Sequence, residues 1–372
     1  MIFSEIDKNP TKKTVLIAPL DWGLGHAARC MPLINELQKY HLRIIIAAEG
    51  PVKTMLKKEF PNIQIIQLSG YRIQYGKNKH WFAFKLFLQL PKIIITIYKE
   101  HLWLKKVVKN YSINAVISEN RFGLYHNSVT CVYITHQLFI KTGNRFSEII
   151  VSKIHNWVIK KYTQCWVPDF KGQQNIAGAL SHPKKMPANV QYIGCLSRFE
   201  KKEITQKEFA LLIILSGPEP QRTIFENVLL SQLSNFNDKV LFVRGLPDNL
   251  EEAILPKIIS SKINIVFKNY LTAQQLNVAI PQSALVISRS GYTTIMDLLK
   301  LGQKAVLVPT PGQTEQEYLA RYLLHQNIFY SIAQQNFLLQ DVIVKANNFP
   351  FTMPIYNMDL YKETIGQFVK TL

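Results

Sequence analysis

The sequence predicts an α/β protein built from two doubly wound, Rossmann-like domains. With 372 residues, the chain exceeds the roughly 250 to 300 residues at which single hydrophobic cores stop growing. Short apolar, β-branched runs alternate with helical patterns in both halves, which is typical of parallel sheets covered by helices on both faces. A charged stretch without a strong apolar face, residues 198–208, separates the two series and is the expected linker.

The first half, residues 1–195, is expected to form the N-terminal domain. Its first strand is the apolar run at residues 14–20, and a helix with apolar residues at helical spacing follows at 27–40. Further strands are expected at residues 42–48, 63–68, 115–118, 131–135 and 164–167, and further helices at 147–161 and 171–180. This order of strand and helix predicts a parallel sheet.

The second half, residues 208–372, repeats this architecture without repeating the sequence. Strands are expected at residues 209–216, 240–244, 263–267, 285–288 and 305–309, and helices at 292–301, 314–326 and 359–369. We expect the last helix to pack back on the N-terminal domain.

Composition narrows the class of protein and of partner. An apolar fraction of 47% with 16 Gly and 18 Pro excludes a disordered or low-complexity chain. The 44 Lys and Arg against 25 Asp and Glu give a formal charge of +19, which favours anionic partners: acidic lipid, phosphorylated substrates or nucleic acid. No recognisable nucleic-acid module is present, so a nucleic-acid partner is not expected.

The cysteines and the N-terminus suggest a location. The four cysteines stand far apart and have neither metal-ligand nor disulfide-framework spacing: Cys30, Cys131, Cys165 and Cys195. Residues 1–13 carry charges where a signal peptide needs an apolar core. We therefore expect a cytoplasmic protein without a metal site.

A glycine turn after the first strand contains the first candidate site. Gly23 and Gly25 lead into a helix that begins with His26 and continues to Arg29. The free N–H groups of such a helix can face an anion or a sugar oxygen. His26 can accept a proton near neutral pH, as a hydroxyl nucleophile requires, although a helix-capping histidine is an alternative.

A second turn from strand to helix stands in the C-terminal half. Arg289, Ser290 and Gly291 precede a helix whose first turn can bind a diphosphate. Asp297 lies two turns along this helix, where it either accepts ribose hydroxyls or is a solvated helix residue.

Two more loops follow strands of the second half. Ser216 and Gly217 end its first strand, at an edge where α/β proteins present atoms to ligands. Residues 309–318 form a Pro- and Gly-containing loop in which Gln316 and Glu317 suit sugar hydroxyls. Glu317 also completes a capping box with Thr314, and both roles can hold together.

In this order and spacing, the four segments resemble glycosyltransferases of the GT-B fold, most closely the MurG-like group, whose C-terminal domain is of family 28. That group adds N-acetylglucosamine to a lipid-linked peptidoglycan precursor. The resemblance covers nearly the whole chain and implies two Rossmann-like domains facing across a cleft. It further implies that His26 is catalytic and that the Arg289 to Asp297 segment holds a nucleotide.

The sequence departs from the family pattern at several positions. Glu317 replaces the second Gln of a Gln-Gln pair that contacts the donor sugar, and the glycine-rich loop reads Ser216-Gly217-Pro218-Glu219. The family's His-Glu-Gln-Asn segment corresponds to residues 135–138, so His136 stands where an acidic residue is usual. Glu119 and Asn120, which follow another strand, can compensate for that loss.

Residues 80–109 mix aromatic and apolar side chains with lysines. Such a helix can lie in an anionic membrane interface, although a core helix with snorkelling lysines gives the same pattern. Lys85, Pro91 and Lys92 interrupt the apolar run, which leaves it short of the roughly 20 residues needed to span a bilayer.

Together these observations predict an inverting, metal-independent transferase without a cofactor. It would move an N-acetylhexosamine from a UDP-sugar to a lipid-linked or cell-envelope acceptor, as a peripheral protein at the inner face of the cell membrane. One alternative is a nucleotide-sugar hydrolase or epimerase of the same fold. The other is a catalytically silent binding protein.

Overall fold

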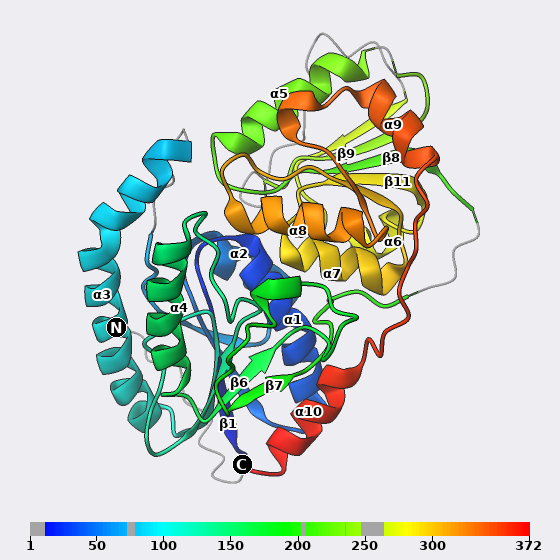
Figure 1. Ribbon diagram of the computed structural model, residues 1–372. Coiled ribbons are helices and arrows are strands. Elements are labelled where there is room, and N and C mark those ends of the chain that lie inside the picture. Colours follow the sequence, from blue (N-terminus) through cyan, green and yellow to red (C-terminus); the bar gives the residue numbers. More distant parts are fainter. Residues whose placement is uncertain (1–11, 73–78, 202–205, 235, 247–263) are drawn as a thin grey trace.

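The computed structural model describes residues 12–72, 79–201, 206–234, 236–246 and 264–372; the side chains of residues 79–88 and 90 are also outside the description. Figure 1 shows two α/β domains, one above the other. Each has a parallel sheet at its centre, and the linker region after residue 195 connects them.

The N-terminal sheet has seven parallel strands in the order β3-β2-β1-β4-β5-β6-β7. Its strands are β1 (Thr14–Pro19), β2 (Arg43–Ala48), β3 (Gln64–Gln67), β4 (Ile113–Glu119), β5 (Thr130–Ile134), β6 (Gln164–Val167) and β7 (Val190–Tyr192). The central pair, β1 and β4, is in a register that sets Pro19 opposite Glu119. The carboxyl ends of the two strands therefore meet at one edge of the sheet.

The C-terminal sheet has six parallel strands in the order β10-β9-β8-β11-β12-β13. Its strands are β8 (Phe209–Ile214), β9 (Val240–Val243), β10 (Ile265–Lys268), β11 (Ser283–Ser288), β12 (Ala305–Leu307) and β13 (Tyr330–Ser331). The predicted strand at residues 263–267 begins outside the described residues. In both sheets the strand order reverses beside the first strand, which is the doubly wound topology that the alternation of elements predicts.

Ten α-helices and two short 3₁₀ turns lie within the described residues. The helices are α1 (Leu24–Gln38), α2 (Gly50–Glu59), α3 (Lys79–Asn110), α4 (Arg145–Ile159), α5 (Gln221–Leu233), α6 (Ala273–Ala279), α7 (Tyr292–Leu301), α8 (Thr314–His325), α9 (Leu339–Asn347) and α10 (Leu360–Val369). The 3₁₀ turns are η1 (Gly178–Leu180) and η2 (Gln334–Asn336).

The helix predicted at residues 171–180 is wrong. Only the turn η1 forms there, because the preceding residues are organised around the buried carboxylate of Asp169. This carboxylate accepts hydrogen bonds from the N–H groups of Ile176 (2.8 Å) and Ala177 (3.0 Å). Gly172 and Gly178 also adopt positive φ angles of 101° and 53°, which end helical geometry.

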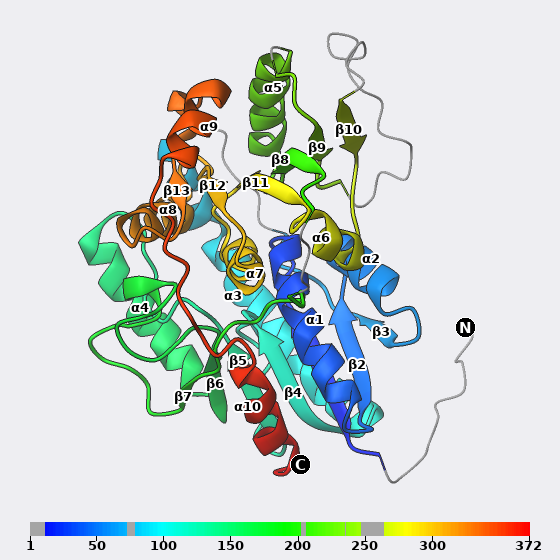
Figure 2. The ribbon, with the colours of Figure 1, turned by 90° about the vertical axis from the view of Figure 1, so that its right-hand side faces the viewer.

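One hydrophobic cluster runs from the N-terminal sheet to the C-terminal sheet. It contains Ile17 of β1, Met31 of α1, Ile295 of α7 and Leu307 of β12. Figure 2 shows α1 and α7 between the two sheets, and the two helices are in contact. The domains are therefore joined by a shared apolar core as well as by the linker.

The last helix, α10, lies against the N-terminal domain in both ribbon views (Figures 1 and 2). It contacts α1, and the ring of Phe368 meets that of Trp166 edge-on with the centroids 5.3 Å apart. The chain thus crosses back from the C-terminal domain, which adds a second covalent connection between the two bodies.

Candidate active site

His26 and Glu119 form a hydrogen-bonded pair where β1 and β4 end. His26 lies in the first turn of α1, directly after β1, and Glu119 is the last residue of β4. His26 Nδ1 is 2.6 Å from Glu119 Oε2. The carboxylate is fully buried, whereas the histidine side chain is 19% exposed. The pair therefore has a shielded end and an end that other molecules can reach.

Arg29, one turn further along α1, holds the other oxygen of the same carboxylate. Its Nε donates to Glu119 Oε1 over 2.9 Å, and its Nη2 donates to the same oxygen. Burial alone would raise the pKa of Glu119, but the electrostatic interactions and hydrogen bonds with Arg29 and His26 outweigh it and lower this pKa to about 2. Glu119 is therefore ionised at neutral pH.

The ionised carboxylate decides which nitrogen of His26 carries the proton. A carboxylate can only accept, so Nδ1–H donates to Glu119, and in the neutral ring Nε2 carries the lone pair. Arg29 Nη2 also lies 2.7 Å from Nδ1, but two donors cannot share a hydrogen bond, so this contact is one of proximity. The arrangement orients the ring and leaves Nε2 able to take a proton.

Asn120 follows Glu119 in a left-handed conformation with a φ angle of 55°. Its Nδ2 donates to Glu119 Oε1 over 3.3 Å, and its Oδ1 accepts from the hydroxyl of Tyr133 over 3.4 Å. Glu119 and Asn120, predicted as acceptor or loop candidates that compensate for the acidic residue missing at position 136, thus bond to each other beside His26. Glu119 directly supports His26.

Arg289, predicted to bind the donor, is buried and bonds to the backbone of two other segments. Its Nη1 donates to the carbonyls of Val308 and Pro309, each over 3.3 Å, and its Nη2 donates to that of Gln221 over 2.9 Å. The guanidinium lies 4.3 Å from the ring centroid of Phe225, and burial lowers the pKa of Arg289 to about 10. In this structure Arg289 therefore fixes the backbone at the carboxyl edge of the C-terminal sheet.

The other predicted donor residues also bond to neighbouring loops. Ser290 Oγ donates to Gln316 O over 2.9 Å, and Gln316 Oε1 accepts from the N–H of Thr310 over 2.9 Å. Glu317 Oε1 accepts from Gly312 N, also over 2.9 Å, so the predicted capping box does not form with Thr314. These bonds fix the loop before α8.

Ser216, Gly217 and Gly291 are more open. Ser216 and Gly217 are exposed, and Gly217 has a positive φ angle of 103°. Gly291 is the N-cap of α7, and no side chain caps this helix within the described residues. Its first N–H groups therefore remain suited to an anion.

Asp297 faces the linker in this structure. Its side chain is 3% exposed; Oδ1 accepts from Ser197 Oγ over 2.7 Å, and Oδ2 is 3.3 Å from Arg198 Nε. Burial raises the pKa of Asp297, with Arg198 and the hydrogen bonds acting in the opposite direction. The ribose role stays a prediction, because these contacts occupy the carboxylate.

Comparisons with known proteins give one answer for the class of protein. Residues 212–358 match the model of the glycosyltransferase family 28 C-terminal domain. A Borreliella burgdorferi protein named UDP-N-acetylglucosamine--N-acetylmuramyl-(pentapeptide) pyrophosphoryl-undecaprenol N-acetylglucosamine transferase is 22% identical over 323 residues, or 84% of this chain and 82% of that protein.

Solved structures have the same fold at low sequence identity. The glycotransferase of kitacinnamycin aligns with a TM-score of 0.61 and 13% identity, over 97% of this chain and 96% of that one. MurG of Acinetobacter baumannii aligns with a TM-score of 0.54 and 13% identity, over 97% and 100%. This protein is a GT-B glycosyltransferase.

The match to family 28 covers one part of the candidate site and leaves out the other. All predicted donor residues, from Ser216 to Glu317, lie within residues 212–358. His26 and Glu119 lie in the N-terminal domain, outside that range. The GT-B fold is thus established for the whole chain, and the chemistry of His26 is inferred from geometry.

Glu315 forms a contact between the two domains that the sequence did not predict. It lies in the first turn of α8 and contacts His136 Nε2 of the other domain over 2.7 Å, while Gln137 Nε2 also donates to it. His136 stacks on Tyr292 with the ring centroids 4.1 Å apart. The contact joins residues 179 positions apart, and no local pattern signals it.

The charge states of this interdomain contact follow from burial. Burial lowers the pKa of His136 although Glu315 opposes it, and no group among the described residues bonds to His136 Nδ1. Burial would raise the pKa of Glu315, but His136 and the nearby Arg29 lower it. A neutral His136 therefore donates from Nε2 to an ionised Glu315. Glu315 thus brings a carboxylate next to position 136, where the resemblance leads us to expect an acidic residue.

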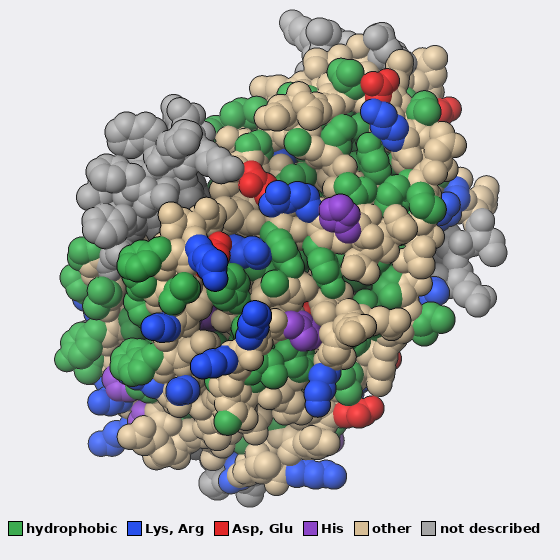
Figure 3. Space-filling view, viewed as in Figure 1, with side chains coloured by type: hydrophobic (Ala, Val, Ile, Leu, Met, Phe, Trp, Pro, Cys, Tyr) green, Lys and Arg blue, Asp and Glu red, His purple; other side chains and the backbone are tan. Residues whose placement is uncertain are grey.

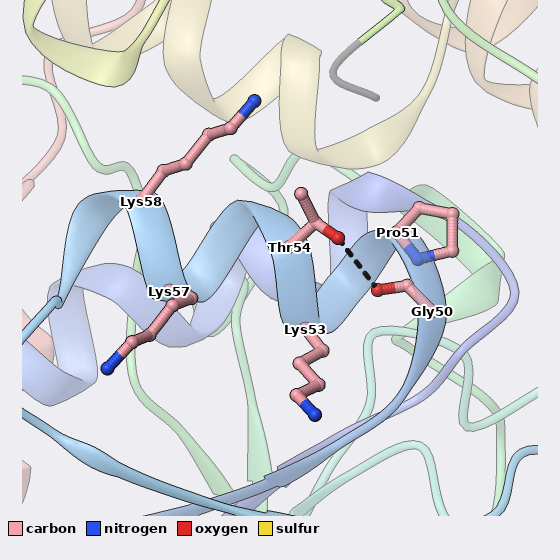
Figure 4. A pocket seen from close by; sticks show the side chains of 6 residues that line it. All are labelled: Gly50, Pro51, Lys53, Thr54, Lys57 and Lys58. Atoms are coloured by element: carbon pink, nitrogen blue, oxygen red, sulfur yellow. Dashed lines mark hydrogen bonds between the residues drawn. The ribbon is translucent and has the colours of Figure 1, made fainter. Parts of the chain in front are cut away.

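A basic cavity of about 630 Å³ lies along α2 (Figure 4). Its walls are Gly50, Pro51, Lys53, Thr54, Lys57 and Lys58. Lys58 points toward the C-terminal domain, and its Nζ lies 5.5 Å from the ring centroid of Tyr270. None of the predicted donor residues lines the cavity. Its lysines raise the positive potential where α2 faces the C-terminal domain.

Within the described part of the chain, no helix is both long and apolar enough to cross a membrane. The side chains at the start of the predicted membrane segment, residues 80–88, lie outside the described residues. From Gln89 to Lys109 that segment belongs to α3, whose exposed side chains include both apolar and basic ones.

Proposed function

We propose that this glycosyltransferase moves a sugar, an N-acetylhexosamine, from a UDP-sugar to a lipid-linked or cell-envelope acceptor with inversion at the anomeric carbon. The proposal is carried by the His26–Glu119 pair, which lies at the strand ends of the N-terminal domain beside α7 of the C-terminal domain. The named activity of the Borreliella burgdorferi relative supports the choice of donor and acceptor.

His26 acts as the general base of this reaction. Nε2 removes the proton from the acceptor hydroxyl while its oxygen attacks the anomeric carbon of the donor. The bond from that carbon to the diphosphate breaks, and its electron pair leaves with the diphosphate. A single displacement from the opposite face inverts the configuration. Glu119 holds the ring and faces the imidazolium that forms.

The departing diphosphate needs positive charge, and the first turn of α7 supplies it. The N-terminus of a helix carries about half a positive charge, and its free N–H groups can bind phosphate oxygens. Gly291 leaves this end open, and Ser290 stands next to it. In this scheme the helix end does the work that a metal ion does elsewhere, so neither a metal nor a cofactor is required.

Other donor contacts follow the sequence prediction. Gln316 and Glu317, which order the loop before α8, would exchange some of these contacts for the sugar hydroxyls. Asp297 would bind the ribose after exchanging Ser197 and Arg198 for the ribose hydroxyls. A small movement of the linker upon donor binding is part of this proposal.

The acceptor would reach the enzyme at a membrane surface. On α3, the exposed apolar side chains include Ile94, Ile95 and Tyr98, which are 65%, 54% and 63% exposed. On α4, Phe146 and Trp157 are 74% and 60% exposed. Figure 3 shows hydrophobic side chains gathered over this part of the N-terminal domain, with Lys and Arg among them.

Apolar and basic side chains in one region suit an anionic lipid interface. Lys99 of α3 and Lys153 of α4 are exposed beside these apolar residues. We therefore place the enzyme on the cytoplasmic side, as a peripheral protein of the cell membrane, bound through residues 80–109 and through α4.

The rival activities use the same geometry. A base at His26 can activate water as well as an alcohol, which would make the protein a nucleotide-sugar hydrolase or epimerase. The apolar surface on α3 and α4 favours a lipid-linked acceptor, since a soluble substrate has no need of it. A silent binding protein would have no need for the ordered His26–Glu119 pair.

Calorimetric titration with nucleotides and nucleotide sugars tests the donor site, with Asp297→Ala as the control. We expect one UDP-sugar to bind and the variant to lose most of that affinity. If no nucleotide sugar binds, the proposed function is wrong. Turnover of the bound sugar to free sugar, with the lipid acceptor present and unused, would favour the hydrolase.

A further inference from the structure

One hydroxyl group connects the C-terminal domain to the surroundings of His26. It belongs to Thr293, the second residue of α7. Thr293 Oγ1 donates to Gly25 O over 3.0 Å and accepts from Arg29 Nη1 over 3.1 Å. The side chain is 8% exposed, and the hydroxyl both donates and accepts there, so its position is closely defined.

The absence of a side chain at Gly25 allows α7 to come this close. A Cβ atom at position 25 would lie 3.0 Å from Thr293 Oγ1, which is tighter than ordinary packing. Gly25 also directly precedes His26 in the chain. The hydrogen bond from Thr293 therefore holds the peptide group to which His26 is attached.

A second route runs through Arg29. Its guanidinium uses Nε and Nη2 for Glu119, and Nη1 for Thr293. Because a guanidinium is planar, a partner at Nη1 restricts the angle at which the other nitrogens meet the carboxylate. Glu119 in turn fixes the His26 ring. Thr293 thus reaches both the backbone and the side-chain partner of His26.

We propose that Thr293 is a positioning residue that aligns His26 for proton transfer when the donor-binding domain closes on the N-terminal domain. This inference rests on the proposed function, in which His26 is the base. When α7 moves away, Gly25 and Arg29 each lose a partner. Proton transfer is then confined to the arrangement in which α7 contacts α1.

Removing only the hydroxyl tests the inference. Thr293→Val keeps the shape of the side chain, and we expect kcat to fall by about tenfold to hundredfold because the base is misplaced. The Kd for the nucleotide sugar should change by less than about threefold, and Thr293→Ser should restore most of the activity.

The control variant is Tyr322→Phe, which also removes one interdomain hydroxyl. Tyr322 OH donates to Asn175 Oδ1 over 3.0 Å, without any link to the pair at His26. We expect its kcat to stay within about twofold of the wild-type value. Equal losses in both variants would show a general effect on domain contact and overturn the inference.

A double variant separates positioning from a structural effect. In a His26→Ala background, Thr293→Val should cause no further loss, because residues that act as one unit are not additive. An additional tenfold loss there would contradict the role of Thr293.

Ring ¹⁵N chemical shifts of His26 give a readout that needs no turnover. The wild-type ring should be protonated at Nδ1 only, and Thr293→Val should show a mixture of the two tautomers. Unchanged shifts with unchanged kcat would overturn the inference. Changed shifts in a protein without sugar transfer would support it and refute the proposed function instead.

Discussion

The functional residues of the N-terminal domain and those of the C-terminal domain are held in different ways. His26, Arg29 and Glu119 come from two segments and bond to each other through charged groups. In the C-terminal domain, Arg289 and Gln316 bond to backbone groups of neighbouring loops. The first group thus bonds to itself through charged side chains, whereas the second orders the loops that a ligand would meet.

This difference bears on how motifs are interpreted. A motif residue such as Arg289 can be necessary for donor binding without touching the donor, because it fixes the backbone that does. Glu119, by contrast, belongs to no recognised motif and still determines which nitrogen of His26 is free. Variants at His26, Glu119, Asp297 and His155 test this difference.

The largest expected effect is that of His26→Ala. Loss of a general base costs about 10² to 10⁴ in kcat, whereas donor affinity should stay within about threefold, because the donor loops lie in the other domain. Transfer rates and calorimetry measure the two quantities. His325→Ala, at an exposed position at the end of α8, is the control. Equal losses of turnover and affinity in His26→Ala would show that the two regions do not differ.

Glu119→Gln should lower kcat by about hundredfold, because the amide removes the charge that selects the Nδ1–H tautomer of His26. Donor affinity should be unchanged. A variant with more than about half of the wild-type turnover would remove Glu119 from the mechanism.

The same variant should change the pH dependence of stability. The pKa of Glu119 is about 2 in the folded protein, below its usual value of 4.5, so the unfolded chain binds more protons between these values. Its contribution to stability is present above pH 4.5 and is lost as the pH falls toward 2. Urea unfolding of Glu119→Gln should therefore show a shallower loss of stability in this range than the wild type does.

Asp297→Ala compared with Ser197→Ala tests the second region. If Asp297 binds ribose, its removal should weaken nucleotide binding by about tenfold, since a hydrogen bond to a charged group contributes about 1.5 to 3 kcal/mol. Ser197→Ala removes the linker contact alone and should leave affinity within about twofold. Equal effects would mean that Asp297 serves the linker only.

The smallest effect concerns His155, a buried histidine of α4 that bonds to the hydroxyl of Tyr133 (2.9 Å). Burial lowers the pKa of His155 to about 4, so the unfolded chain binds more protons between pH 6.5 and 4. Stability should fall as the pH drops through this window. His155→Gln should flatten that slope in urea unfolding measured at several pH values, with no change in kcat at neutral pH. An unchanged slope would contradict a neutral His155.

The alternation of apolar strands and helices was enough to predict both sheets, because parallel strands give continuous apolar runs. The strands Val190–Tyr192 and Tyr330–Ser331 were not predicted, because two or three residues are too few to show an alternating pattern. The helix predicted at residues 171–180 was wrong since a distant carboxylate, that of Asp169, captures its N–H groups.

The contacts between the candidate site residues were not predicted, for a similar physical reason. The sequence indicates that His26 and Arg29 begin a helix, and it indicates that Glu119 ends a strand. Their contact depends on the pairing of β1 with β4, which a single sequence does not reveal. Glu315 and Thr293 were missed because their partners lie in the other domain, 179 and 268 positions away.

The anomeric configuration of the product tests the central claim most directly. Proton NMR of the glycoside made from a UDP-α-N-acetylhexosamine and a lipid-linked acceptor should show a β linkage in the wild-type reaction, and His26→Ala should form this product about 10² to 10⁴ times more slowly. An α-linked product would contradict the single displacement. Free sugar alone, formed at the same rate with and without the acceptor, would contradict transfer itself.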